Sequence, residues 1–348
     1  MDERFEFLPD DFETVTIDEK NFIDATYASK PYWKDVISRF SKNKGAVVGL
    51  FAILLIIVMA IIGPHLSGYT FDGQVIENQN LAPRVQGLED LGVFDGSETM
   101  RTASKTKVIN KYVKEGEETG LENTYYWFGT DTLGRDLFTR VWTGTRISLY
   151  MALIAVLIDM LFGLSYGMIS GYFGGAIDSA MQRFSEVLNS IPTLVIVTLL
   201  MLILKPGLAT ITFALMFTGW IGMSRIARAQ VLKIKEQEFV LASRTLGARN
   251  FFILFKEILP NIFGQIIIVS MFSIPNAIFT EAFLAFVGLG VPKPLASLGS
   301  LISDAYNSFT THPYMIVFPV IVLGLIMLSF NMLADGLRDA FDPKMKEM

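Results

Sequence analysis

Long runs of uncharged apolar residues recur along this 348-residue chain, and they restrict its fold more than any other feature. The first run extends from Val47 to Ile62 and, with its small flanking residues, is long enough to cross a bilayer. Because 51% of the residues are hydrophobic and only 18% are charged, the chain lacks the polar surface that a soluble domain needs. The sequence therefore predicts an integral membrane protein and not an ordinary cytosolic enzyme.

Six stretches are predicted to span the membrane as helices. They lie at or near residues 46–65, 148–170, 177–204, 208–223, 258–287 and 314–333. The first lies too far from the N-terminus to be a secretory signal, and Pro64-His65 after it is not a small-residue cleavage site. We therefore expect it to remain as a membrane anchor.

The short loops that are rich in Lys and Arg predict the orientation of the chain. Five basic residues lie within residues 30–44 and seven within the loop 224–258, whereas the loop around Lys205 and residues 288–313 hold one lysine each. The two basic segments are therefore expected to face the cytoplasm. An even number of spans places the C-terminal segment, residues 337–348, on the same side, so both termini are predicted to be cytoplasmic.

Two segments precede the first span. Residues 1–29 are expected to form an acidic cytoplasmic tail that is mobile or is ordered by a partner, because nine acidic residues fall within the first 24. In residues 30–45, Trp33, Val36, Ile37 and Phe40 recur at helical spacing. This pattern predicts an amphipathic elbow helix along the lipid headgroups; the alternative is a helix that packs on protein.

Residues 66–146 form a long polar segment, which the predicted orientation places outside the cell. Because structureless segments of this length are uncommon in compact proteins, we expect it to contain a small helix or hairpin. Two roles are possible for this segment: it docks an outside partner, or it only covers the membrane surface without a binding role.

The loop between the fourth and fifth spans contains the sequence EFVLASRTLGARNFFILFKEILPN from Glu238 to Asn261. Gly247 permits a turn and Asn250 is suited to cap a following helix, so the pattern predicts two helices separated by a break. A short helix held between two spans can transmit force from a cytoplasmic machine. The alternative is a solvated connector whose positive charge only sets the topology.

This loop resembles the EAA loop of bacterial ABC importer permeases, whose pattern is Glu-Ala-Ala, three residues, Gly, nine residues, Ile, one residue and Leu-Pro. The matching residues are Ala242, Gly247, Leu259 and Pro260, and the departures from the pattern are Leu241, Ser243 and Glu257. Stretches that resemble the oligopeptide/dipeptide branch of this family occupy residues 127–149, 170–175, 281–294 and 330–343. The resemblance covers most of the chain from Lys30 onward.

The resemblance implies an all-α integral membrane protein with the six-helix type I ABC importer permease fold, an elbow helix and an external insertion. Its core would be residues 147–336. In a bacterial cell membrane, this chain and a paired permease would form the pathway through the membrane lipid, two ATPase subunits would bind the cytoplasmic loops, and an external binding protein would deliver peptide. ATP and Mg would be used by the ATPase subunits, and this chain would bind no cofactor.

The sequence agrees with that division of labour, because no Gly is followed by Lys and the phosphate-binding pattern GxxxxGK[ST] is therefore absent. Closure of the ATPases would push the segment from Glu238 to Arg249 and so open or close the pathway. The implied coupling residues are Glu238, Phe239, Leu241, Ala242, Ser243, Arg244, Gly247 and Ala248.

Two acidic residues within the predicted spans are candidates for the pathway, because an ionisable group among apolar helices usually faces a cavity or a polar partner. Asp159 lies near the middle of the second span, where it lines the pathway, packs as a buried polar group or pairs with the partner permease. Glu281 precedes the glycines at 288 and 290, where the helix is expected to break. Its carboxylate either satisfies free backbone donors or meets the amino end of a peptide.

Several other functions are not expected. A formal net charge of -5 without a basic stripe argues against nucleic acid. The chain has no Cys, and His65 and His312 are far apart beside prolines, so neither a metal site nor an enzyme active site is predicted. Two rivals remain: a nickel or dipeptide permease, and an autonomous secondary transporter, which inverted repeats with broken helices would favour.

Overall fold

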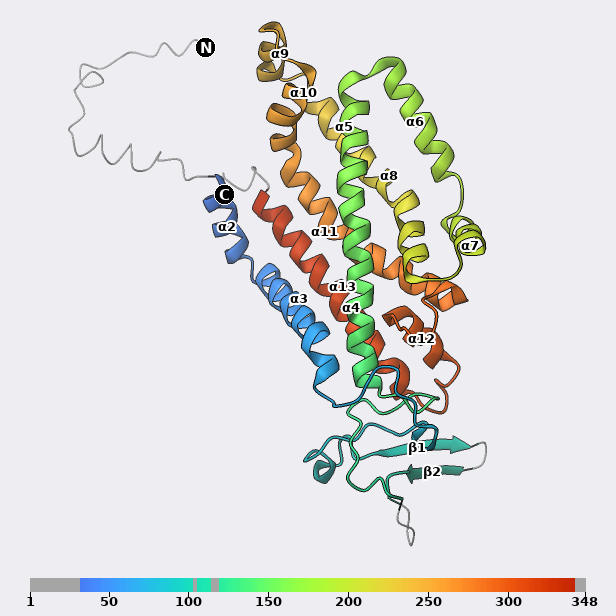
Figure 1. The fold of residues 1–348 in the computed structure, drawn as a ribbon. Helices are drawn as coiled ribbons and strands as arrows, with labels where there is room; N and C mark the ends of the chain where they lie inside the picture. Colours follow the sequence, from blue (N-terminus) through green and yellow to red (C-terminus); the bar gives the residue numbers. More distant parts are fainter. Residues whose placement is uncertain (1–31, 103–104, 114–118, 342–348) are drawn as a thin grey trace, which may run out of the picture.

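The computed structural model describes residues 32–102, 105–113 and 119–341, and the predicted acidic tail lies outside these residues. The apolar runs of the sequence form long helices that lie side by side, with a β-hairpin at one end of the bundle (Figure 1). The α-helices are α2 Tyr32–Lys42, α3 Lys44–Ile62, α4 Leu137–Ile158, α5 Leu164–Phe173, α6 Gly175–Asn189, α7 Thr193–Leu204, α8 Leu208–Ile234, α9 Glu238–Thr245, α10 Asn250–Phe252, α11 Leu259–Leu284, α12 Leu298–Tyr306 and α13 Tyr314–Phe341. Three π-helical segments are η5 Asp159–Gly163, η6 Ile253–Ile258 and η7 Ala285–Leu289.

Within the described residues, four continuous helical segments are long and apolar enough to cross a membrane, namely Lys44–His65, Leu137–Phe173, Asn250–Leu289 and Tyr314–Phe341. A fifth candidate is the pair α6 and α7, which meet at an angle of 76°. α8 has 27 residues, about 40 Å of helix, but Arg225, Arg228 and Lys233 occupy its second half. The chain is therefore a helical membrane protein, and the count of six spans stays a prediction.

Residues 177–204, which were predicted as one span, form two helices, α6 and α7. Pro192 lacks an amide hydrogen and disfavours helical geometry at the preceding Ile191, so the chain bends between α6 and α7. The start of the second span also differs, because α4 begins at Leu137 inside the segment predicted to lie outside the membrane. Asp136 caps it by accepting a hydrogen bond from the Thr139 amide at 2.9 Å.

A seam of glycines joins α5 to α8. Gly163, Gly167 and Gly171 recur every four residues and so lie on one face of η5 and α5. A Cβ at Gly167 would overlap the Ser224 carbonyl oxygen of α8, and those of its two neighbours in the seam would likewise meet α8 backbone atoms. Small residues let membrane helices approach closely, so this seam fixes the position of α8 against the second span.

The N-terminal helix α2 packs partly on protein. Val36 is buried and Phe40 packs against the core formed by α3, α4, α11 and α13, whereas Trp33 and Ile37 are 55% and 66% exposed. The indole of Trp33 also contacts the ring of Phe341 at the end of α13. The predicted amphipathic helix is present, and its position at the lipid headgroups stays a prediction.

The segment between α3 and α4 contains the expected hairpin. Strands β1 Ser97–Thr102 and β2 Lys105–Asn110 are antiparallel, and three short 3-10 helices lie at Gly63–His65, Ile76–Asn78 and Glu89–Leu91. The segment is fixed to the start of α13, because Tyr314 Oη donates to the Thr130 carbonyl at 2.9 Å and His312 Nδ1 lies 2.6 Å from Glu98 Oε2. It forms a cap on the end of the bundle opposite α9 (Figure 1).

Candidate functional site

The α9 loop projects from the end of the bundle, and one buried side chain anchors it. α8 continues to Ile234, so the connection itself is shorter than the predicted loop 224–258. Val240 is completely buried and belongs to the apolar cluster that contains Ile253, Leu254 and Ile258. Because this cluster also includes residues of α5, α8 and α11, displacement of α9 would act on all three helices.

All eight predicted coupling residues lie at the surface of this loop. Six of them are exposed and two, Ser243 and Ala248, are half-buried. Phe239 and Leu241 are 41% and 45% exposed, and the neighbouring Leu246 is 87% exposed. Apolar side chains gathered on a projecting loop are typical of a protein-binding surface.

Gly247 ends α9 in the left-handed conformation that the sequence predicted. Its φ is +81°, its amide donates to the Arg244 carbonyl at 3.1 Å, and the Ala248 amide donates to the Ser243 carbonyl at 3.0 Å. A Cβ at Gly247 would meet no atom within 4 Å, so a larger side chain would extend from the surface. The glycine is required by the backbone and not by packing.

Side-chain contacts hold the loop against the bundle. Ser243 Oγ donates to Glu257 Oε1 at 2.5 Å, and the Arg244 guanidinium lies 5.5 Å from the centre of the Tyr172 ring. The prediction that Asn250 caps the second helix was wrong, because Arg249 occupies the cap position and Asn250 Oδ1 instead accepts from Tyr172 Oη at 3.0 Å. The loop is therefore fixed to α5 as well as to its own spans.

Asp159 lies at a polar cavity of about 290 Å³ between α4, α7, α8 and α11. Its side chain is 7% exposed, and Oδ1 has no hydrogen-bond partner among the residues that the structure describes. The polar lining residues are Asp159, Thr193, Thr218, Ser273, Asn276 and Thr280. Gly219 and Gly222 of α8 also line the cavity, and a Cβ at Gly219 would come within 2.8 Å of Asp159 Oδ1. The carboxylate thus depends on a glycine for its space.

Glu281 is not among the residues that line this cavity. It is 1% exposed and Oε2 accepts a hydrogen bond from Ser148 Oγ at 3.1 Å, while the Leu298 amide donates to the same serine oxygen at 3.3 Å. The carboxylate thus joins α11 to α4 near the start of α12. The expected helix break follows it, with Gly288 at a φ of +88°.

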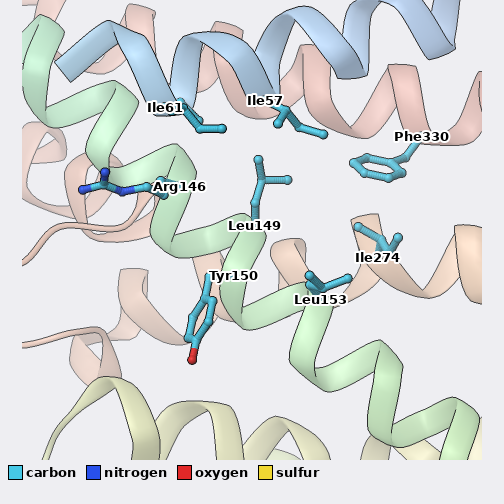
Figure 2. A pocket seen from close by; sticks show the side chains of 9 residues that line it. Ile57, Ile61, Arg146, Leu149, Tyr150, Leu153, Ile274 and Phe330 are labelled. Atoms are coloured by element: carbon cyan, nitrogen blue, oxygen red, sulfur yellow. The ribbon is translucent and has the colours of Figure 1, made fainter. Parts of the chain in front are cut away.

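A second groove, also of about 290 Å³, lies between α3, α4, α11 and α13. Figure 2 shows Ile57 and Ile61 beside Leu149 and Leu153, with Arg146 at one end and Phe330 at the other. Its lining is almost wholly apolar, so it offers few partners for the peptide groups of a polar cargo. Sequence reasoning singled out neither this groove nor the glycine seam, although the four-residue spacing of the seam was visible in the sequence.

No group of three or more His, Asp or Glu side chains within the described ranges could hold a metal ion. The two histidines have different surroundings, since His65 is exposed and His312 pairs with Glu98.

Comparison with known proteins identifies relatives over nearly the whole chain. Residues 161–347 match the family described as "Binding-protein-dependent transport system inner membrane component", and residues 31–83 match the "N-terminal TM domain of oligopeptide transport permease C". The chain is 42% identical to the oligopeptide transport system permease protein OppC of Bacillus subtilis, with 90% of each chain covered. It is 41% identical to the dipeptide transport system permease protein DppC of the same organism, with 97% of this chain and 94% of that one covered.

Two further similarities are to a permease protein of another bacterium and to a solved structure. The oligopeptide transport system permease protein OppC of Escherichia coli K12 is 37% identical, with 90% of this chain and 91% of that one covered. An inward-facing structure of the MetNI methionine ABC transporter aligns with 59% of this chain and 96% of its own, at 19% identity and a TM-score of 0.49. The sequence relatives, and not this alignment, identify the family.

Proposed function

The chain belongs to the family of binding-protein-dependent transport system inner membrane components, and we propose that it is a permease subunit of an ATP-driven importer of short peptides. It would form the pathway with a paired permease, bind two ATPase subunits on its cytoplasmic side and receive peptide from an external binding protein. ATP hydrolysis, and the Mg that it needs, would belong to the ATPase subunits.

The observation that carries this proposal is the α9 surface. α9 is anchored by one buried side chain, exposes apolar residues and contacts several spans. Such a helix can transmit a displacement from a bound protein to the helix bundle. We assign ATPase coupling to the eight exposed or half-buried loop residues from Glu238 to Ala248 that the sequence singled out. Their basic neighbours favour a cytoplasmic position for α9 and for both termini.

We assign the pathway to the Asp159 cavity. Its carboxyl, hydroxyl and amide groups offer a transported peptide more hydrogen-bond partners than the second groove, where only Arg146 and Tyr150 have polar side chains. Glu281 is the weaker candidate, because Ser148 already donates to its carboxylate.

A dipeptide cargo is the second candidate, because the two relatives named for oligopeptide and dipeptide transport are nearly equally similar to this chain, at 42% and 41% identity. In both cases we expect the external binding protein to select the cargo.

Substitution of Gly247 by Trp tests the coupling role. The complete importer would be reconstituted in proteoliposomes, and ATP hydrolysis and uptake of a radiolabelled peptide would be measured together. We expect hydrolysis to continue while uptake per ATP falls, because the new side chain separates the ATPase from α9. Unchanged coupling and uptake would contradict the proposal.

Gly87→Trp is the matched control. Gly87 also has a positive φ, +82°, and open space around its Cβ position, but it lies in the segment that caps the other end of the bundle. The Gly87→Trp variant should have the same backbone strain, but its uptake per ATP should equal that of the wild type. Transport by this chain alone, without ATPase subunits, would instead support an autonomous transporter.

A further inference from the structure

Asp159 has the features of a binding group and not of a packing group. Its side chain is more than nine-tenths buried, yet no donor within the described part of the chain pairs with Oδ1. A buried carboxylate without a partner is costly, so such groups usually serve a ligand, a metal or another chain. Glu281 Oε1 and Asp136 Oδ1 also lack a donor, but the second oxygen of each carboxylate accepts, from Ser148 and from Thr139 respectively.

The backbone around Asp159 leaves its carboxylate facing the cavity. The π-helical turn η5 begins at this residue, and such turns occur frequently at functional sites. Asp159 also begins the face that continues as the glycine seam, at four-residue intervals through Gly163 to Gly171. Beside Asp159, α8 supplies Gly219 and Gly222, whose missing side chains leave the space that the carboxylate faces.

The charge of the cavity defines what it would attract. Asp159 supplies a negative charge, and the other lining residues are neutral; the polar ones among them carry hydroxyl or amide groups. A cation that enters would pair with the carboxylate and donate hydrogen bonds to the side-chain oxygens of Thr218, Ser273 or Asn276. The volume of about 290 Å³ accepts a single side chain or one end of a peptide, and not a whole oligopeptide.

We propose that the Asp159 cavity is a cation subsite of the transport pathway, which holds an ammonium or guanidinium group of the passing peptide. This inference rests on the proposed function, because a cation subsite for a passing peptide requires that the chain forms a peptide pathway. The importer would then have a selectivity step in the membrane, in addition to that of its external binding protein.

The test compares Asp159→Asn with the wild-type chain in the complete reconstituted importer. Uptake rates would be measured for three peptides, Ala-Lys-Ala, Ala-acetyllysine-Ala and Ala-Glu-Ala, with the same binding protein throughout. Because delivery is identical in both importers, any change in the ratio of rates arises in the membrane. We expect the preference for the lysine peptide over its acetylated form to fall roughly three- to tenfold in the variant.

Two sources of the cation give different results. A loss confined to the lysine peptide assigns the cavity to side-chain cations, whereas an equal loss for all three peptides that Asp159→Glu restores assigns it to the terminal ammonium. An equal loss that glutamate does not restore overturns the inference. Unchanged ratios of the peptide uptake rates, with uptake itself intact, would also overturn the inference. They would not contradict the proposed function. Absence of uptake of every peptide by the wild-type importer would instead overturn the proposed function.

Asp304→Asn is the matched charge control. It removes one carboxylate from an exposed ion pair with Lys293, whose Nζ lies 3.1 Å from Asp304 Oδ1, outside the cavity. The peptide ratios of this variant should equal those of the wild type. A shift as large as that of Asp159→Asn would show a general charge effect and overturn the subsite.

Discussion

Ser243 Oγ donates a hydrogen bond to Glu257 Oε1 at 2.5 Å, and both residues occupy positions where the chain departs from the EAA pattern. The serine replaces the second alanine of the pattern and the glutamate replaces its isoleucine. A polar group introduced at one position thus has a partner at the other. The two departures compensate each other, and they join α9 to the start of the fifth predicted span.

We predict that Ser243→Ala destabilises the protein by about 1–3 kcal/mol, because the half-buried Glu257 carboxylate loses its donor. Addition of Glu257→Ile should recover much of that loss, so the effects of the two substitutions should not add. Thermal unfolding of the purified importer would measure all three variants. Thr245→Ala is the control, since its exposed hydroxyl donates only to the Leu241 carbonyl within its own helix. Strictly additive effects would contradict the pairing.

The sequence predicted what depends on local chemistry. The apolar runs, the basic loops and the Gly247 turn each follow from residues close together in the chain. The structure has helices over the apolar runs and the turn at Gly247, although residues 177–204 are bent at Pro192 and α4 begins earlier than expected. The sequence did not predict which polar groups meet across the fold. The Ser243–Glu257 contact, the Tyr172–Asn250 hydrogen bond and the space beside Asp159 each depend on how separate helices pack.

Gly167 tests the seam between α5 and α8. We predict that Gly167→Ala lowers stability by about 2–3 kcal/mol, because the new Cβ would overlap the Ser224 carbonyl and the Ala227 methyl group. Gly324→Ala in α13 is the control, since its Cβ would meet nothing within 4 Å. Thermal midpoints measured in the same detergent compare the two. Equal midpoints would show that α5 and α8 can separate without cost.

Asp95 should make the hairpin segment sensitive to acid. The Ser97 hydroxyl and amide donate to its carboxylate at 2.6 and 2.8 Å, and these hydrogen bonds hold its pKa below the usual range. A lowered folded-state pKa means that the stabilisation is present above about pH 4 and is lost as the pH falls through the folded value. Amide exchange of residues 97–102, corrected for intrinsic rates, should therefore show protection that declines in acid.

Asp95→Asn separates titration from hydrogen bonding. Its amide oxygen still accepts from Ser97 but does not titrate, so protection in this variant should stay constant across the same pH range. Asp90→Asn, an exposed change on the neighbouring 3-10 helix, should keep the wild-type profile. An acid decline that persists in Asp95→Asn would assign the effect to another group.

Asp159 should lower the stability of the chain while serving transport. Because its buried carboxylate lacks a donor within the residues described, replacement by Asn should raise the unfolding free energy by about 1 kcal/mol. Asp178→Asn should have the opposite effect, since that carboxylate accepts from Arg228 at 2.5 and 2.7 Å and from Ser170 at 2.5 Å. Thermal midpoints of the two variants, measured against the wild type in one membrane mimetic, should therefore move in opposite directions. If Asp159→Asn lowered the midpoint as Asp178→Asn does, Asp159 would be a packing residue with a structural partner.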